Sequence, residues 1–140
     1  MLFRSGNPDT HVILRGGSHG PNYDKTQVDA AVQALTRRGL NPRLIIDASH
    51  ANSGKSHLRQ AEVALELAGR LEAGGPASSV LAGIMLESFL MAGSQKLDED
   101  NPGALAYGQS ITDACMGWET SARILDSLAE ATRMRREEGQ

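Results

Sequence analysis

Short apolar runs alternate with helical patterns along this chain, and this alternation limits the possible folds more than any other feature. Strands are expected within residues 11–17, 43–50 and 79–88. Apolar residues recur at helical spacing over residues 24–39, 56–71 and about 118–136. Strands separated by helices are typical of βαβ units, in which the strands run parallel. The sequence therefore predicts an α/β fold around a three-stranded parallel sheet.

The apolar residues also predict which surfaces are buried. The strands are continuous apolar runs rather than alternating ones, which is the pattern of a sheet covered on both faces. The helical residues expected to face inward are Val28, Ala31, Val32, Leu35, Leu58, Ala61, Leu65, Ala68, Ile124, Leu125 and Leu128. Because the chain has only one Trp, two Tyr and two Phe, its core must consist of aliphatic side chains and Met.

Charge and hydropathy exclude several classes of protein. The formal net charge is -3 and no basic run is present, which argues against nucleic acid as a partner. The longest apolar run, residues 80–86, is too short to span a bilayer, so no membrane partner is expected. Residues 1–10 turn polar too early for a signal peptide, and the single Cys115 cannot form an internal disulfide. We therefore expect one soluble, cytoplasmic domain over residues 1–140.

Polar residues follow each expected strand at its carboxyl end. Arg15 and two glycines follow the first strand, the second ends in Asp47-Ala48-Ser49-His50, and the third ends in Glu87-Ser88. Because ligands of parallel α/β sheets bind at this edge, the pattern predicts a functional site there. Arg15 suits a phosphate or carboxylate group, which its guanidinium can bind through two hydrogen bonds. An internal ion pair with a neighbouring acid is the alternative for Arg15.

His50 and Glu87 are expected close together because the ends of adjacent strands lie roughly 5 Å apart. An imidazole beside a carboxylate is a common divalent-metal pair or acid/base pair. A histidine that merely forms a hydrogen bond at a strand end is an equally good interpretation. Asp113 lies beyond a long polar segment, residues 92–109, and could return as a third ligand or serve as a helix N-cap.

Other polar residues are interpreted as outside the site. His11, His19 and His57 are expected to be bystanders, and Cys115 to be buried filler rather than a nucleophile. The GKS sequence at 54–56 lacks the glycine that a phosphate-binding loop needs five positions before Gly54, where Ser49 stands. An ATPase is therefore not expected.

Five sequence blocks, in order along the chain, resemble a known family. They are LRGG at 14–17, PNYD at 21–24, IDASHANSGK at 46–55, IMLES at 84–88 and LAYGQSITDACMGWE at 105–119. These blocks resemble the C-terminal part of the microbial class I enzymes that make 3-deoxy-D-arabino-heptulosonate 7-phosphate (DAHP). The combination of SHANS with ITDAC is the most specific part of the resemblance.

The resemblance to DAHP synthases implies a fold, a reaction and a set of site residues. The fold would be the last three β/α units, strands six to eight, of a (β/α)8 TIM barrel. The reaction condenses phosphoenolpyruvate with erythrose 4-phosphate, releasing phosphate, in the first step of the shikimate pathway to aromatic amino acids. By motif, Arg15 would bind phosphoenolpyruvate. His50, Glu87 and Asp113 would be three of four ligands to a divalent Mn, Fe, Co or Zn ion.

The chain also departs from the family, because the first five barrel strands are missing from it. The family's cysteine metal ligand, its KPRT segment for erythrose 4-phosphate and its inhibitor-binding region are missing with them, and Cys115 is not that ligand. Three β/α units cannot close a barrel. We therefore expect an incomplete enzyme that is inactive when alone. The alternatives are a half-barrel assembly module, pairing with a second copy or a separate N-terminal chain, and an unrelated metal-dependent aldolase or hydrolase.

Overall fold

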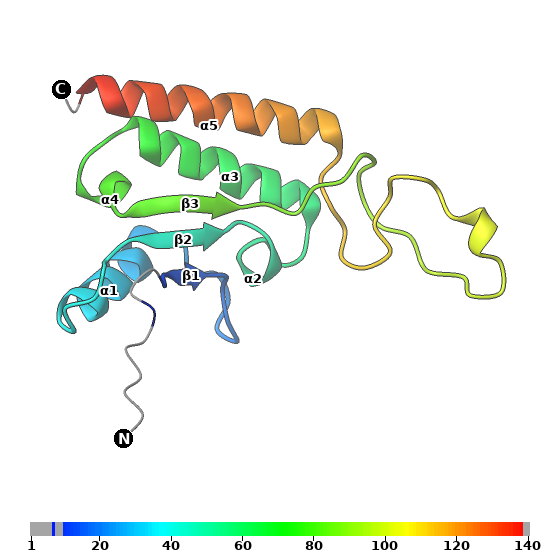
Figure 1. Ribbon diagram of the computed structural model, residues 1–140, viewed down its shortest axis with the longest axis horizontal. Coiled ribbons are helices and arrows are strands. Elements are labelled where there is room, and N and C mark those ends of the chain that lie inside the picture. The colour runs from blue at the N-terminus through cyan, green and yellow to red at the C-terminus, as the bar shows by residue number, and fades with distance from the viewer. Residues whose placement is uncertain (1–6, 8–9, 139–140) are drawn as a thin grey trace.

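A three-stranded parallel sheet organises the computed structural model, which describes residue 7 and residues 10–138 (Figure 1). The elements in chain order are β1 (Val12–Leu14), α1 (Lys25–Thr36), β2 (Leu44–Asp47), α2 (His50–Ser53), α3 (His57–Glu72), α4 (Pro76–Ser79), β3 (Leu81–Met85), the 3-10 turn η1 (Pro102–Ala104) and α5 (Trp118–Glu138). The predicted α/β class and parallel sheet are confirmed. The expectation about a signal peptide concerns residues that lie mostly outside those described.

The strands lie in the order β1-β2-β3, so β2 is central and pairs in parallel with both neighbours. Ile46 stands opposite Leu14 on one side and Ile84 on the other. The register between β2 and β3 shifts between Leu44 and Ile45. All three arrows in Figure 1 point toward α2 and the long segment that precedes α5, so the carboxyl ends share one edge of the sheet.

Side-chain caps place the starts of the two helices that flank the sheet. The Asp24 carboxylate accepts a hydrogen bond from Gln27 N at the start of α1, and Ser56 accepts one from Arg59 N at the start of α3. After α1 the chain turns at Gly39, whose φ of 65° is costly for other residues. The predicted long helices are therefore confirmed, with ends that differ by a few residues.

One face of the sheet is buried, and the other is only partly covered by the described residues. Leu44 and Ile46 of β2 are almost fully buried in the main apolar cluster, together with Val28 of α1. On the opposite face Ile13 is 40% exposed and Met85 is 39% exposed. The expected coverage of both faces is therefore wrong for the described chain, because the helices pack on one face.

Helix α3 turns a different side inward from the one that its apolar spacing predicts. Leu58 and Leu65 are 69% and 49% exposed, whereas Val63 and Leu67 are fully buried. The buried arc faces both the sheet and α5, which packs along α3 (Figure 1). In α5, Ile124 is buried as predicted but Leu125 is 56% exposed, because α5 contacts its neighbours along a single stripe.

Two strand predictions extend too far. Residues 76–79, the approach to β3, form the short helix α4, in which the Ser78 hydroxyl and backbone N–H both donate to Gly75 O. At the other end of the sheet, β2 stops at Asp47 and His50 begins α2. His50 is therefore not a strand residue, although it stays at the predicted edge.

The polar segment between β3 and α5 is an excursion whose two arms are joined by hydrogen bonds. Met91 N donates to Gly108 O at 2.8 Å, and Gly93 and Cys115 exchange a pair of backbone hydrogen bonds. Nearer the sheet, Phe89 N donates to Met116 O at 2.9 Å and Met116 N donates to Glu87 O at 3.1 Å. These contacts return the chain before α5 to the carboxyl edge of the sheet.

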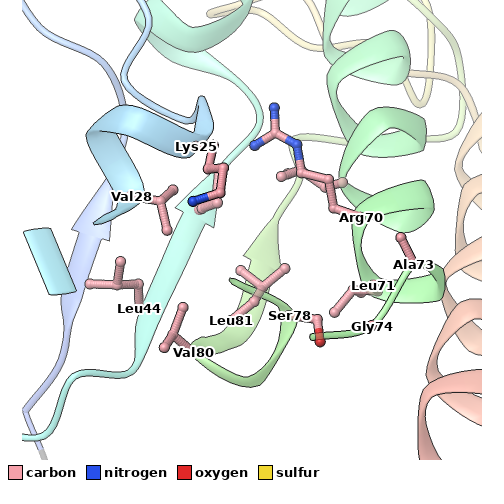
Figure 2. Close-up of a pocket in the computed structure, with 12 residues that line it drawn as sticks. Lys25, Val28, Leu44, Arg70, Leu71, Ala73, Gly74, Ser78, Val80 and Leu81 are labelled. Atoms are coloured by element: carbon pink, nitrogen blue, oxygen red, sulfur yellow. The ribbon is translucent and has the colours of Figure 1, made fainter. Parts of the chain in front are cut away.

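A cavity of about 250 Å³ lies at the opposite, amino end of the strands (Figure 2). Figure 2 shows Lys25 and Val28 of α1 on one side and Arg70 and Leu71 on the other, above the start of β2 and the approach to β3. Its wall is largely aliphatic, and its two cations are already paired, Lys25 with Asp29 and Arg70 with Glu66. The cavity is therefore separate from the polar edge of the sheet.

The orientation of α3 predicts unequal effects for two leucines of the same helix. Leu67→Ala is expected to lower the free energy of unfolding by about 2–5 kcal/mol, because Leu67 is fully buried. Leu65→Ala is the matched control, and its half-exposed side chain should cost less than about 1 kcal/mol. Urea unfolding followed by circular dichroism measures both. Equal losses, or a larger loss at Leu65, would contradict the described packing.

Candidate metal centre

Three potential metal ligands converge at the carboxyl edge of the sheet. His50, Glu87 and Asp113 each offer one ligand atom, and these atoms lie within 4.8 Å of one another. His50 begins α2, Glu87 follows β3, and Asp113 lies on the return arm before α5. Within this group, His50 Nε2 and Glu87 Oε1 are 3.5 Å apart. The structure thus brings together the three residues that the sequence analysis proposed as ligands.

His50 lies in a tight turn between β2 and α2. Its φ of 46° is in the left-handed region, which costs a residue other than glycine about 1–3 kcal/mol. Lys55 N donates to His50 O at 2.8 Å, which closes the turn on its carboxyl side. On the ring, Nδ1 is 2.7 Å from Asp47 Oδ2 and 2.8 Å from Ser49 Oγ. The second ring nitrogen, Nε2, faces Glu87.

Glu87 is held through its backbone by a buried amide. Gln60 of α3 is 1% exposed; its Nε2 donates to Glu87 O at 3.0 Å, and its Oε1 accepts from Glu87 N at 2.6 Å. Both backbone polar groups of Glu87 are therefore paired with one side chain. The Glu87 side chain is 31% exposed, and its Oε1 already lies toward His50.

Asp113 lies in a bend rather than at a helix start. Because α5 begins only at Trp118, the N-cap alternative for Asp113 is wrong. Its carboxylate is 41% exposed and its Oδ1 is 3.4 Å from Lys55 Nζ. Cys115 is partly buried, and its Sγ lies 3.5 Å from Asp113 O. Lys55 thus places a positive charge beside the acidic side of the cluster.

A second buried amide joins the ends of β1 and β2. Asn52 of α2 is 2% exposed, and its Nδ2 donates to Leu14 O at 3.0 Å and to Asp47 O at 2.7 Å. Its Oδ1 accepts from Asn22 N at 2.8 Å, and Asn22 in turn accepts a hydrogen bond from Gly16 N. The turn after β1 is therefore attached to the turn that carries His50.

Arg15 directly follows β1 and is exposed at the same edge. Within the described part of the chain it forms no ion pair, so the internal ion-pair alternative has no support there. Gly16, with a φ of +77°, lies tightly against α2: a Cβ at this position would be 2.7 Å from Ala51 Cβ and 2.9 Å from Asn52 N. Glycine thus allows the chain after Arg15 to contact α2.

The cluster fits a divalent cation of intermediate softness. One imidazole nitrogen and two carboxylate oxygens form a mixed donor set that suits such ions. Two atoms that each lie about 2.1 Å from a cation are roughly 3–4 Å apart, which matches the 3.5 Å between His50 and Glu87. Asp113, whose side chain is 41% exposed, can supply the third ligand oxygen. Among the described residues, no other group of three comes this close, and His11, His19 and His57 join none.

Four residues that build this site were not predicted to take part in it: Asp47, Asn52, Lys55 and Gln60. Asn52 and Gln60 are buried amides whose hydrogen bonds reach other segments of the chain. In the sequence, the only indication of their roles is a polar residue within an expected helix or turn. Their hydrogen-bond partners are known only from the three-dimensional structure. Asp47 ends the apolar run of β2, and its burial was not predicted.

Comparison with known proteins identifies one family along most of the chain. A family model described as the DAHP synthetase I family matches residues 2–126. A phospho-2-dehydro-3-deoxyheptonate aldolase from Corynebacterium glutamicum is 50% identical over 137 residues, covering 94% of this chain and 36% of that protein. A Trp-sensitive aldolase of the same name from Enterobacter agglomerans is 50% identical over 127 residues, covering 91% of this chain and 35% of that protein.

A solved structure shares the fold. The phospho-2-dehydro-3-deoxyheptonate aldolase of Francisella tularensis SCHU S4 superposes with a TM-score of 0.84 at 39% sequence identity. The alignment covers 93% of this chain and 36% of that chain. The chain thus spans about a third of the length of the relatives that it matches.

The buried amide of Asn52 predicts a large loss of stability on truncation. Asn52→Ala leaves the carbonyls of Leu14 and Asp47 without this donor, and each buried group left unpaired costs about 1–3 kcal/mol. We expect the free energy of unfolding to fall by at least about 2 kcal/mol. Asn41→Ala, at an exposed turn, is the control and should cost under about 0.5 kcal/mol in urea titrations. Similar values for both variants would contradict the role given to Asn52.

Proposed function

The chain belongs to the DAHP synthetase I family, and on this premise we propose that it forms part of an enzyme that makes DAHP. Such an enzyme joins the enolpyruvate carbon of phosphoenolpyruvate to the aldehyde carbon of erythrose 4-phosphate and, with one water consumed, releases phosphate. It is a transferase that performs an aldol-type condensation. The observation that carries the proposal is the convergence of His50, Glu87 and Asp113 at the carboxyl edge of the sheet.

We propose that the three strands are the sixth, seventh and eighth of a (β/α)8 barrel. Superposition on about a third of a solved relative supports this assignment. The partly exposed face that carries Ile13 and Met85 would then point toward the barrel interior. The outer edges of β1 and β3 have no further strand beside them among the described residues, so each can pair with another one.

In this proposal His50, Glu87 and Asp113 hold a divalent Mn, Fe, Co or Zn ion. When bound, such a cation acts as a Lewis acid that polarises a carbonyl oxygen. The chain's own part is to hold the ligands in place: Gln60 fixes the backbone of Glu87, and Asp47 contacts the ring of His50. A cysteine, the fourth ligand that the family resemblance implies, would come from outside this sequence.

Arg15 is proposed to bind phosphoenolpyruvate. It is exposed at the same edge as the metal ligands, and its guanidinium has no ion-pair partner within the described residues. A free guanidinium can bind a phosphate or carboxylate through two parallel hydrogen bonds. The contact of Gly16 with α2 keeps this arginine near the turn that carries His50.

We further propose that this chain alone has little or no turnover. The erythrose 4-phosphate segment and the fourth ligand of the family do not occur in its sequence, and each contributes to positioning and charge stabilisation. Activity would require the remaining strands from a separate N-terminal chain, because a second copy carries the same three strands and neither missing segment. The comparisons do not favour an independent half-barrel module, and family membership removes the unrelated hydrolase alternative.

Localisation in the cytoplasm is also part of the proposal. No helix in the described part of the chain is both long and apolar enough to cross a membrane. Phosphorylated sugar and enolpyruvate substrates are charged, and an enzyme that consumes them works in the aqueous phase in which they dissolve.

Complementation tests the proposed reaction. The 140-residue chain alone should not consume phosphoenolpyruvate with erythrose 4-phosphate and Mn²⁺. Mixed with the N-terminal remainder of the Corynebacterium glutamicum relative, it should consume phosphoenolpyruvate in a reaction that EDTA abolishes. Asp113→Asn should reduce the restored rate by at least about 100-fold, whereas Asp98→Asn, an exposed acid of the excursion, should not. Turnover by the chain alone, or equal effects of both variants, would contradict the proposal.

The role of Arg15 predicts a specific kinetic change in the restored enzyme. Arg15→Ala should raise KM for phosphoenolpyruvate by about 10- to 100-fold, because a hydrogen bond to a charged group contributes about 1.5–3 kcal/mol. Arg43→Ala is the matched control, since Arg43 is exposed at the amino end of β2, far along the strand from the site. An unchanged KM for phosphoenolpyruvate in Arg15→Ala would remove this arginine from the proposed substrate site.

A further inference from the structure

A buried carboxylate faces Nδ1 of His50, the ring nitrogen that points away from Glu87 and Asp113. Asp47 is 2% exposed, and its Oδ2 lies 2.7 Å from His50 Nδ1. Its Oδ1 accepts hydrogen bonds from Ser49 N at 2.8 Å and from Ser49 Oγ at 2.5 Å. As a carboxylate, Asp47 can only accept hydrogen bonds, so a donor is required opposite Oδ2.

The hydrogen-bond pattern assigns the proton on the His50 ring. Ser49 has one hydroxyl proton, which it donates to Asp47 Oδ1, so its oxygen can only accept from His50 Nδ1 at 2.8 Å. Both oxygens that face Nδ1 are therefore acceptors. In neutral imidazole only one nitrogen carries a proton, and a proton on Nδ1 leaves the lone pair on Nε2.

The other end of the ring lies in the ligand cluster. Nε2 is 3.5 Å from Glu87 Oε1, and its lone pair is what a cation needs from imidazole. The opposite tautomer would present a hydrogen there instead. The backbone of His50 is in the left-handed region, with a φ of 46°. The position of the ring therefore also depends on a backbone conformation that few residues other than glycine adopt.

We propose that Asp47 is a positioning residue that selects the Nδ1–H tautomer of His50 and thereby leaves Nε2 available to a divalent cation. Carboxylates commonly orient metal-ligating histidines in this way. The inference rests on the proposed metal site for its function, whereas the tautomer itself is a property of the metal-free chain. Asp47 touches neither the cation nor the substrate in this proposal.

The test combines a spectroscopic and a binding measurement on the 140-residue chain. Nitrogen-15 NMR of histidine-labelled, metal-free protein reports which ring nitrogen carries the proton. The chain has only four histidines, so His50→Gln identifies the signals of His50. Calorimetric titration with Mn²⁺ or Co²⁺ then measures metal affinity in the same samples.

Asp47→Asn is the informative variant because it keeps the shape of the side chain. Its amide oxygen can still accept from Ser49, but its NH₂ group then faces His50 Nδ1 as a donor. We expect the proton of His50 to move to Nε2 and the affinity for Mn²⁺ to fall by about 10- to 100-fold. Asp24→Asn, the same exchange at the distant N-cap of α1, should change neither quantity.

Two results would overturn the inference: a neutral wild-type His50 ring that carries its one proton on Nε2, or an Asp47→Asn variant with the wild-type tautomer and affinity. Should Asp47→Asn fail to fold, the wild-type spectrum and that of Ser49→Ala decide, since both should show the Nδ1–H form. A purely structural role of Asp47 would lower thermal stability while leaving the tautomer unchanged. Failure of the proposed metal site is recognised separately, as a Mn²⁺ affinity that does not change in Glu87→Gln.

Discussion

The buried carboxamide of Asn52 is the interaction on which the arrangement of this edge depends. Its two N–H groups bind the last carbonyls of β1 and β2, and its oxygen binds the loop at Asn22. One buried side chain thus joins residues 14–22, the end of β1 and the loop after it, to the end of β2. Because leaving such groups unpaired is costly, the ends of the two strands cannot separate easily. Arg15 and His50 are positioned relative to each other as a consequence.

A similar arrangement repeats for the second half of the cluster, where Gln60 binds both backbone groups of Glu87. Met116 N also binds Glu87 O, which ties the return arm, and with it Asp113, to the end of β3. In each case hydrogen bonds between a buried amide side chain and the main chain position the ligands. The ligand side chains themselves stay partly exposed, as a site that must admit ions and substrates requires.

Much of this could be predicted from the chain alone. The three strands, the long helices and the convergence of His50, Glu87 and Asp113 follow from periodicity, strand polarity and motif resemblance. The inward stripe of α3 could not, because Leu65 and Leu67 lie in equally apolar surroundings in the sequence and differ only in what they face. The roles of Asp47 and Gln60 could not be predicted either, since their burial depends on neighbours that pack around them.

The order and type of the elements, and the edge at which polar groups gather, follow from the amino-acid sequence alone. Both are local properties, since helical spacing, apolar runs and strand ends are readable within about a dozen residues. Three features instead depend on packing in three dimensions: which polar side chains are buried, which face of α3 packs inward, and which nitrogen of His50 faces the ligand group. Those outcomes depend on contacts between segments such as Leu14 with Asn52 and Gln60 with Glu87, and no local pattern specifies such pairs.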